Sequence, residues 1–124
     1  MSIRRAVPNL PAEDPAGCRE FYEQVLGFEV AMDQGWIVTF VSPSNPTAQI
    51  SVLRQDATAA VPADVSVEVD DVDAVHAAAV ARGLEIVHPL TDESWGVRRF
   101  FVRGPGGVVV NVVSHHGGEG PAGG

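Results

Sequence analysis

A loose internal repeat runs through this sequence and limits the folds that are open to it. Asp14 precedes an amphipathic run that ends at Gly27 and leads into a short apolar segment. About 57 residues later the same order returns, because Asp71 precedes an amphipathic run that ends at Gly83. Aspartate is favoured at the N-cap of a helix, and glycine directly after its C-terminus. The repeat therefore predicts two copies of one unit, each built around a helix.

Segments with the pattern of β-strands surround both predicted helices. Residues 64–69 alternate strictly, with valines on one face and polar side chains on the other. Pro8 would confine the first strand to an edge or to an unpaired position. The sequence thus predicts an α+β fold of two tandem βαβββ modules, with strands at residues 3–10, 28–32, 36–41, 48–53, 64–69, 85–90, 97–102 and 108–114.

The predicted modules belong to a single domain. Module one covers about residues 3–55 and module two about 63–114, and a chain of 124 residues suits one domain spanning 1–114. Residues 115–124 are rich in glycine and are expected to form a flexible tail.

Composition argues against several classes of function. The formal net charge is −8, whereas binding of nucleic acid needs a concentrated basic surface. Arg98, Arg99 and Arg103 do cluster, and we expect them to form ion pairs or a solvated face. No apolar run reaches the ~18 residues of a membrane span, and the first residues lack the pattern of a signal peptide. With one cysteine, Cys18, the sequence predicts a cytoplasmic protein without an internal disulfide.

Three segments together resemble one known superfamily. They are FYEQVLGFEV at residues 21–30, VEVDDVDAVHAAAVARG at 67–83 and WGVRRFFVRGPGG at 95–107. In combination they resemble the vicinal oxygen chelate superfamily, also called the glyoxalase, bleomycin-resistance and extradiol dioxygenase group, from about Arg4 to Ser114. The resemblance implies that the modules pair into one curled mixed sheet, which forms a cup with the helices packed outside.

The resemblance also indicates where a metal would bind, because metal-dependent members place a His or Glu ligand on the first and last strand of each module. Counting seven residues back from the two capping aspartates gives Val7 and Asp64. The matching places on the last strands are Gln49, or Ser51 if the register slips by two, and Asn111. Valine offers no lone pair, and amide oxygens are weak ligands for Zn²⁺, Fe²⁺ or Ni²⁺. The sequence therefore predicts neither a metal nor another cofactor.

The histidines do not supply the missing ligands. His76 is expected on the surface of the second helix, outside the cup. His88 is expected on a strand or its following loop, where it either reaches the rim of a pocket or stays apart from it. His115 and His116 follow the last strand and fall in the predicted tail.

Without a metal, the cup is a concave pocket with an aromatic and apolar lining and a few polar anchors, which is the usual anatomy of a small-molecule site. Trp36 and Trp95 either stack on a planar or cationic ligand or fill the core of a dimer. Asp64 and Glu68 either bind a cation or act as a base, or they face solvent at an open rim. The expected ligand-binding residues are Val7, Asn9, Trp36, Phe40, Gln49, Asp64, Glu68, Trp95, Arg99, Phe101 and Asn111, with Val38, Ser51, Ser66 and Val109 as further lining residues.

These features favour a metal-free small-molecule-binding protein, similar to the bleomycin-resistance branch, that sequesters an aromatic or cationic natural product. The alternative is an enzyme, either a metal-dependent lyase, isomerase or dioxygenase with atypical ligands, or a metal-free proton-transfer catalyst that uses Asp64 or Glu68. A homodimer is expected, because a half-open sheet leaves strand edges and an apolar surface that symmetric pairing covers. The sequence leaves open whether the modules pair within one chain or between two chains.

Overall fold

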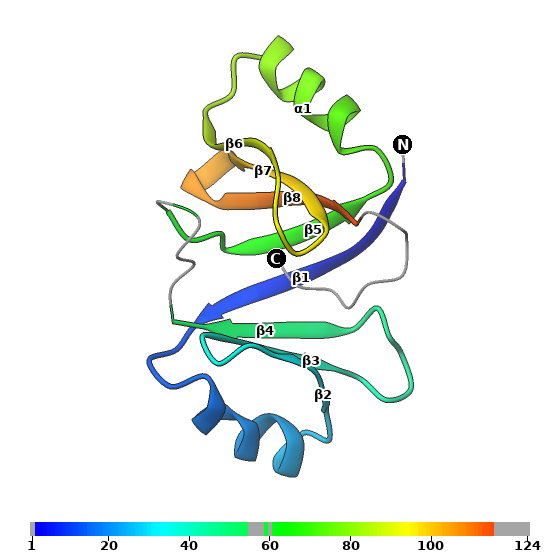
Figure 1. Cartoon of the computed structure of the whole chain (residues 1–124), viewed down its shortest axis with the longest axis vertical. Helices are drawn as coiled ribbons and strands as arrows, with labels where there is room; N and C mark the ends of the chain where they lie inside the picture. Colours follow the sequence, from blue (N-terminus) through cyan, green and yellow to red (C-terminus); the bar gives the residue numbers. More distant parts are fainter. Residues whose placement is uncertain (1, 55–58, 60, 116–124) are drawn as a thin grey trace.

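Two modules with the same order of strands and helical segments make up the structure (Figure 1), a computed structural model that describes residues 2–54, 59 and 61–115. Apart from His115, the expected glycine-rich tail lies outside the described residues. The first module contains β1 (Ile3–Pro11), η1 (Ala16–Cys18), η2 (Glu20–Val25), β2 (Glu29–Asp33), β3 (Ile37–Val41) and β4 (Gln49–Leu53). The second module contains β5 (Val65–Val69), α1 (Val72–Ala81), β6 (Ile86–Asp92), β7 (Val97–Arg103), η3 (Pro105–Gly107) and β8 (Val109–His115).

Aspartate side chains begin the helical segment of each module. The Asp71 carboxylate accepts a hydrogen bond from the backbone N–H of Ala74 at 3.1 Å, which confirms Asp71 as the N-cap of α1. The Asp14 carboxylate makes the corresponding contact with the backbone N–H of Gly17 at 3.2 Å. Gly83 follows α1 with φ 69°, a conformation that glycine adopts without steric cost. Among the described residues, neither helical segment has the length and apolar character of a membrane-spanning helix.

The first helical segment is irregular, and the apolar side chains of its amphipathic run do not share one buried face. Phe21, Val25 and Leu26 are 53%, 68% and 53% exposed, whereas Cys18 and Tyr22 pack against the sheet. The cause is the π-helical geometry of η2, in which the Leu26 N–H bonds to the Phe21 carbonyl oxygen at 3.2 Å. A turn with i→i+5 hydrogen bonds is wider than an α-helical turn, so spacings of three and four no longer share one face.

The eight strands form one open mixed sheet in the order β2-β3-β4-β1-β5-β8-β7-β6, which curls into a cup between the two helical segments (Figure 1). Within each module the first and last strands are parallel, and the antiparallel pair of β1 and β5 joins the modules within one chain. Because β1 lies between β4 and β5, the first of the two alternatives for Pro8, an edge strand, is wrong. Pairing with β5 ends at Pro8 and pairing with β4 begins at Asn9, so the proline lies where β1 changes its partner.

Apolar side chains form a separate core under each helical segment. In module one, Val38, Phe40 and Val52 pack against Tyr22, and the rings of Phe40 and Tyr22 stack with centroids 4.9 Å apart. The expectation that Val38 and Phe40 line the cup is therefore wrong, because both side chains point to the helical side of β3. The corresponding core of module two contains Val67, Val69, Val72, Ala79, Phe100 and Val112.

The opposite face of the sheet carries buried polar side chains. Thr39 alternates with the core residues of β3, and its hydroxyl lies 2.8 Å from the hydroxyl of Ser51 on β4. Buried polar groups require hydrogen-bond partners, and here they gather on the cup face rather than in the apolar cores under the helical segments. The buried polar and charged residues are Thr39, Gln49, Ser51, Ser66, Glu68, Arg99 and Asn111.

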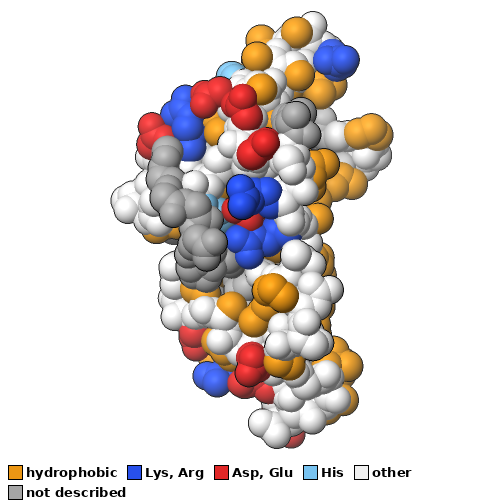
Figure 2. Space-filling view, turned by 90° about the vertical axis from the view of Figure 1, so that its right-hand side faces the viewer, with side chains coloured by type: hydrophobic (Ala, Val, Ile, Leu, Met, Phe, Trp, Pro, Cys, Tyr) orange, Lys and Arg blue, Asp and Glu red, His pale blue; other side chains and the backbone are white. Residues whose placement is uncertain are grey.

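Two of the clustered arginines, Arg98 and Arg103, form ion pairs outside the cup, as expected. Arg98 binds Asp73 at 2.9 Å and Asp92 at 3.1 Å, and Arg103 binds Glu85 at 3.0 Å. Figure 2 shows basic and acidic side chains close together on one face of the molecule, rather than a continuous basic patch there.

Candidate functional site

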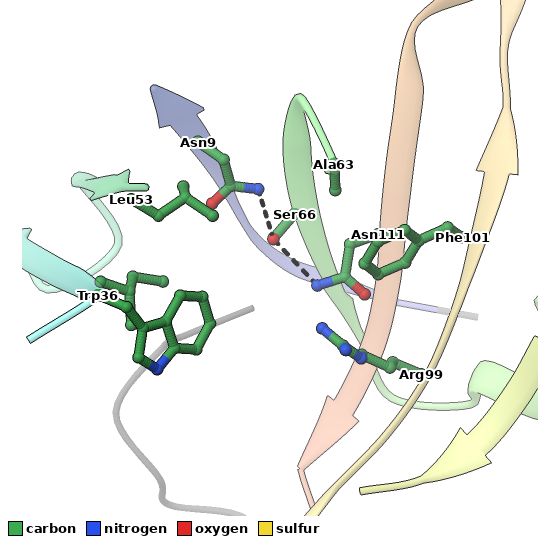
Figure 3. Close-up of a pocket in the computed structure, with 9 residues that line it drawn as sticks. Asn9, Trp36, Leu53, Ala63, Ser66, Arg99, Phe101 and Asn111 are labelled. Atoms are coloured by element: carbon green, nitrogen blue, oxygen red, sulfur yellow. Dashed lines mark hydrogen bonds between the residues drawn. The ribbon is translucent and has the colours of Figure 1, made fainter. Parts of the chain in front are cut away.

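A narrow pocket lies between the two modules on the cup face of the sheet (Figure 3). Its empty space is about 260 Å³, part of it open to solvent, and its centre leaves room for little more than a water molecule. Strands of both modules contribute to its walls, so the site depends on the pairing of β1 with β5. The pocket is lined by Asn9, Trp36, Ile37, Leu53, Ala63, Ser66, Arg99, Phe101 and Asn111.

Three polar side chains form a hydrogen-bonded row across the pocket. Asn9 Nδ2 donates to Ser66 Oγ at 2.9 Å, and Asn111 Nδ2 donates to the same oxygen at 3.0 Å (Figure 3). Asn9 is paired with Ser51 across β1 and β4, and Ser66 is paired with Asn111 across β5 and β8. The two copies of the repeat thus place equivalent pairs side by side at the centre of the cup.

The row leaves one polar atom without a partner. Asn111 is 1% exposed, and within the described part of the chain its Oδ1 atom accepts no hydrogen bond. Leaving a buried acceptor unpaired costs roughly 1–3 kcal/mol. Such atoms are uncommon in native proteins, and this one belongs to a residue of the pocket wall.

Arg99 supplies the charge of the pocket wall. It is fully buried, and its Nε donates to Glu93 Oε2 at 2.7 Å, while His88 Nε2 lies 3.1 Å from the same oxygen. The guanidinium carbon lies 5.0 Å from the ring centroid of Trp95 and 4.9 Å from that of Phe101, distances typical of cation–π contacts. The loop after β6 and the strand β7 therefore hold the guanidinium in place, and it points toward the pocket (Figure 3).

The two tryptophans have different places. Trp36 lines the pocket directly, and Figure 3 shows its ring on the opposite side from Arg99 and Asn111. Trp95 is 39% exposed and contacts the guanidinium of Arg99 rather than the pocket itself. Only Trp36 is thus placed to stack on a molecule in the pocket.

Of the four positions expected to match metal ligands, only Asn111 lines the pocket. Gln49 Nε2 donates to the Pro46 carbonyl oxygen at 2.7 Å, and the Asp64 carboxylate accepts from the Val109 N–H at 2.8 Å. The four residues therefore do not converge in this pocket. Counting back from a helix cap identifies the cup-facing side of a strand but not the depth of a residue in the cup.

The residues that do converge lie two positions further along their strands. Asn9 and Ser66 take the places that had been expected for Val7 and Asp64, while Val7 is buried beside them as the register partner of Ser66. The sequence reasoning also missed Ile37, Leu53 and Ala63 as lining residues. Ile37 could have been predicted from Thr39, because side chains two residues apart lie on the same face of a strand. A single threonine in an apolar strand indicates the face that does not pack against a helix.

Glu68 lies on the cup face but does not line the pocket. Its carboxylate accepts a hydrogen bond from Arg5 Nε, and His115 Nδ1 lies 2.9 Å from its other oxygen. Glu68 is 4% exposed, so the alternative of an open, solvated rim is wrong for this residue. His115 is the last residue of β8 rather than part of a tail, because it pairs with Val97 of β7.

The family follows from comparison with known proteins. The model of the Glyoxalase/Bleomycin resistance protein/Dioxygenase superfamily matches residues 4–112, which is most of the chain. This chain belongs to that superfamily. No curated protein matches the sequence significantly.

Solved structures of superfamily members share its fold. A member from Vibrio splendidus 12B01 has a TM-score of 0.63 at 17% identity, over 92% of this chain and 99% of that one. The Mn(II)-bound glyoxalase from Novosphingobium aromaticivorans has a TM-score of 0.63 at 19% identity, over 97% of this chain but 42% of its own. A structure described as an NAD-dependent benzaldehyde dehydrogenase from Legionella pneumophila has a TM-score of 0.71 at 16% identity, over 89% and 98%. At these identities the likeness shows the fold alone.

The pocket of this superfamily member does not fit a transition metal. Its side-chain oxygen atoms belong to the neutral amides of Asn9 and Asn111 and to the hydroxyl of Ser66. Transition metals in proteins are held by imidazole, thiolate or carboxylate groups. Across residues 2–54, 59 and 61–115, no three His, Cys, Asp or Glu side chains gather in an arrangement that could hold a metal ion.

Proposed function

We propose that this superfamily member is a metal-independent receptor that binds a small aromatic molecule in the pocket between its modules, which widens beyond the water-sized space at its centre when the ring enters. The unpaired, buried Asn111 Oδ1 in the pocket wall carries the proposal, because a ligand that donates a hydrogen bond to it would remove the cost of its burial. Trp36 and Phe101 supply flat apolar surface beside it. Concave sites with apolar walls and few polar anchors are the usual sites of small ligands.

The pocket wall supports an aromatic ligand more strongly than a cationic one. Arg99 carries a permanent positive charge, and none of the described residues that line the pocket is acidic. Glu93 pairs with this charge at 2.7 Å but does not line the pocket, so a cation there would find no carboxylate in the described pocket wall. The acidity of the whole chain acts at the surface and does not reverse this local preference.

We assign binding rather than catalysis to the pocket. The carboxylates considered as bases, Asp64 and Glu68, already accept hydrogen bonds, and neither lines the pocket. A protein that binds an aromatic natural product without converting it sequesters that product. This is the role that we propose here, in a superfamily whose description includes bleomycin resistance proteins.

A thermal-shift screen tests the proposal. A ligand that binds only the folded protein raises Tm, and at a concentration 100 times Kd it stabilises the fold by about 2.7 kcal/mol. We expect flat aromatic compounds to raise the Tm of the wild type and of Val80→Ala, an exposed position on α1, but to raise the Tm of Trp36→Leu much less. If no compound of a broad aromatic panel raises Tm, the proposed function is wrong.

Metal analysis separates the receptor from the alternative of a metal-dependent lyase, isomerase or dioxygenase. The protein is purified without a histidine tag, and its metal content is measured. We expect far less than one transition-metal ion per chain, and no effect of a chelator on ligand binding. A stoichiometric transition metal whose removal abolishes binding would support the enzyme instead.

A further inference from the structure

Hydrogen bonds and an ion pair hold the polar side chains that line the pocket. Asn9 and Asn111 both donate to Ser66 Oγ, at 2.9 and 3.0 Å, and these bonds fix both amides. Arg99 is fully buried, and its Nε donates to the Glu93 carboxylate at 2.7 Å. None of these groups can turn away from the pocket without breaking a hydrogen bond that is largely shielded from water, which costs free energy.

Burial holds the apolar side chains of the wall. Phe101 is 1% exposed, and its ring centroid lies 5.0 Å from that of His88. Ile37 and Leu53 are buried, and they are register partners in the pair of β3 and β4. Ala63 carries only a methyl group, which has no rotamer to change. These side chains and the polar ones therefore form the fixed part of the wall.

Trp36 is held differently. It lies between β2 and β3, directly before Ile37, and its side chain is only half-buried. Among the residues that the structure describes, none makes a hydrogen bond or a ring contact with its indole. Its backbone carbonyl oxygen accepts from the Arg54 N–H at 2.9 Å, so the main chain is anchored while the side chain can change its rotamer.

The pocket is too small for an aromatic ring while Trp36 stays in its present position. The centre leaves room for little more than a water molecule, whereas a cavity that holds one benzene ring has about 150 Å³. A ring therefore enters only if a side chain of the wall moves. Figure 3 shows the indole across the pocket from Asn111 and Arg99, so an outward turn of the indole widens the space between them.

We propose that Trp36 is the movable wall of the pocket and sets the size of the ligand that the pocket admits. Without a ligand the indole lies over the pocket, because this position buries apolar surface, and thermal motion turns it outward. One planar ring then enters beside Asn111, and the indole closes on the face of that ring. A second fused ring would keep the indole turned out into water, so Trp36 acts against larger ligands. The inference deepens the proposed function and rests on it.

Nitrogen-15 relaxation of the indole groups tests the motion in the full-length wild type without a ligand. The chain has two tryptophans, and Trp95→Phe assigns their two indole signals. Order parameters report picosecond-to-nanosecond motion, and relaxation dispersion reports exchange over microseconds to milliseconds. We expect the Trp36 indole to show an order parameter below about 0.6 or measurable dispersion. The Trp95 indole, which lies against the Arg99 guanidinium, should be rigid on both timescales.

Two probes of different size test the selection by isothermal titration calorimetry. Phenol has one ring and 2-naphthol has two fused rings, and each carries one hydroxyl that can donate to Asn111 Oδ1. Trp36→Ala removes the indole face from both compounds, but it removes the obstacle only for 2-naphthol. We therefore expect the ratio of the phenol Kd to the 2-naphthol Kd to rise at least tenfold above that of the wild type. Phe21→Ala truncates an exposed aromatic side chain of η2 and should keep the wild-type ratio.

The outcomes separate this inference from the proposed function. A Trp36 indole as rigid as that of Trp95 overturns the movable wall, and an unchanged Kd ratio in Trp36→Ala overturns the selection by size. If either result is found while aromatic compounds still raise Tm, the inference fails and the proposed receptor stands; if no aromatic compound raises Tm, both fail. Should Trp36→Ala not fold, Trp36→Phe keeps a smaller ring at this position and is expected to raise the ratio in the same direction.

Discussion

Glu68 links three strands of the cup through one carboxylate. It accepts a hydrogen bond from Arg5 of β1 and lies 2.9 Å from the imidazole of His115 of β8. Burial by itself would raise the pKa of Glu68, but the hydrogen bond and charge of Arg5, with a smaller contribution from His115, outweigh burial and lower the pKa. The charged carboxylate therefore stabilises the joint between the two modules.

Stability should decrease in acid because of Glu68. A carboxyl group whose pKa is lower in the folded than in the unfolded state stabilises the fold above the unfolded pKa, and this contribution disappears as the pH falls through the folded pKa. We expect Glu68→Gln to lower the free energy of unfolding by roughly 1–3 kcal/mol at pH 7 and to make it less dependent on pH below about pH 5.

Urea unfolding between pH 7 and pH 3 measures this effect. Glu29→Gln, which changes an exposed carboxylate on β2, is the matched control and should follow the wild type. If Glu68→Gln and the wild type lose stability in parallel over the whole range, the ion pair does not contribute as described.

At the scale of elements, β3 divides its side chains between two different environments. Val38 and Phe40 are buried in the core under the first helical segment, whereas Thr39 contacts Ser51 on the cup face. The neighbouring segment η2 leaves several apolar side chains exposed, among them Val25. Stability of module one therefore depends on β3 more than on the apolar residues at the end of η2.

Two truncations should separate these contributions. Phe40→Ala removes a fully buried ring that stacks on Tyr22, and we expect it to lower the free energy of unfolding by about 3–5 kcal/mol. Val25→Ala changes a side chain that is 68% exposed and should alter stability by less than about 0.5 kcal/mol. Chemical denaturation measures both values, and a cost below about 1 kcal/mol for Phe40→Ala would contradict the assignment of its face.

At the scale of the whole molecule, the sheet is open. The strands β2 and β6 are the outermost in its order, and each has one neighbour in the described chain. Large apolar side chains are also exposed, including Ile3 at 70% and Leu84 at 44%. Strand edges and exposed apolar groups favour association, and a symmetric dimer is the commonest way to cover them.

We therefore predict that the protein is a homodimer in solution. Size-exclusion chromatography with light scattering should give a mass of about twice the 13.1 kDa of one chain. A monomeric mass at all protein concentrations would contradict the prediction.

Several features of the sequence are local properties that depend on a few neighbouring residues. They are the spacing of Asp14 and Asp71, the glycines that follow them, and the alternation of Val67 and Val69. Together they determine two modules, the N-cap of α1 and the core-facing side of β5. The resemblance carried by residues 21–107 gave the curled sheet and the family. The same resemblance predicts that Asn111 stands at a place where metal-dependent members carry a ligand.

The tertiary structure alone decided what meets in the pocket. The contacts of Asn9 with Ser66 and of Ser66 with Asn111 join residues that are 57 and 45 positions apart, and they depend on how β1, β5 and β8 are aligned. A shift of two residues keeps every side chain on its own face, so sequence alternation is satisfied equally well by Val7 and by Asn9. Sequence periodicity therefore determines the side of a strand, whereas the register of distant strands determines which residues on that side come together.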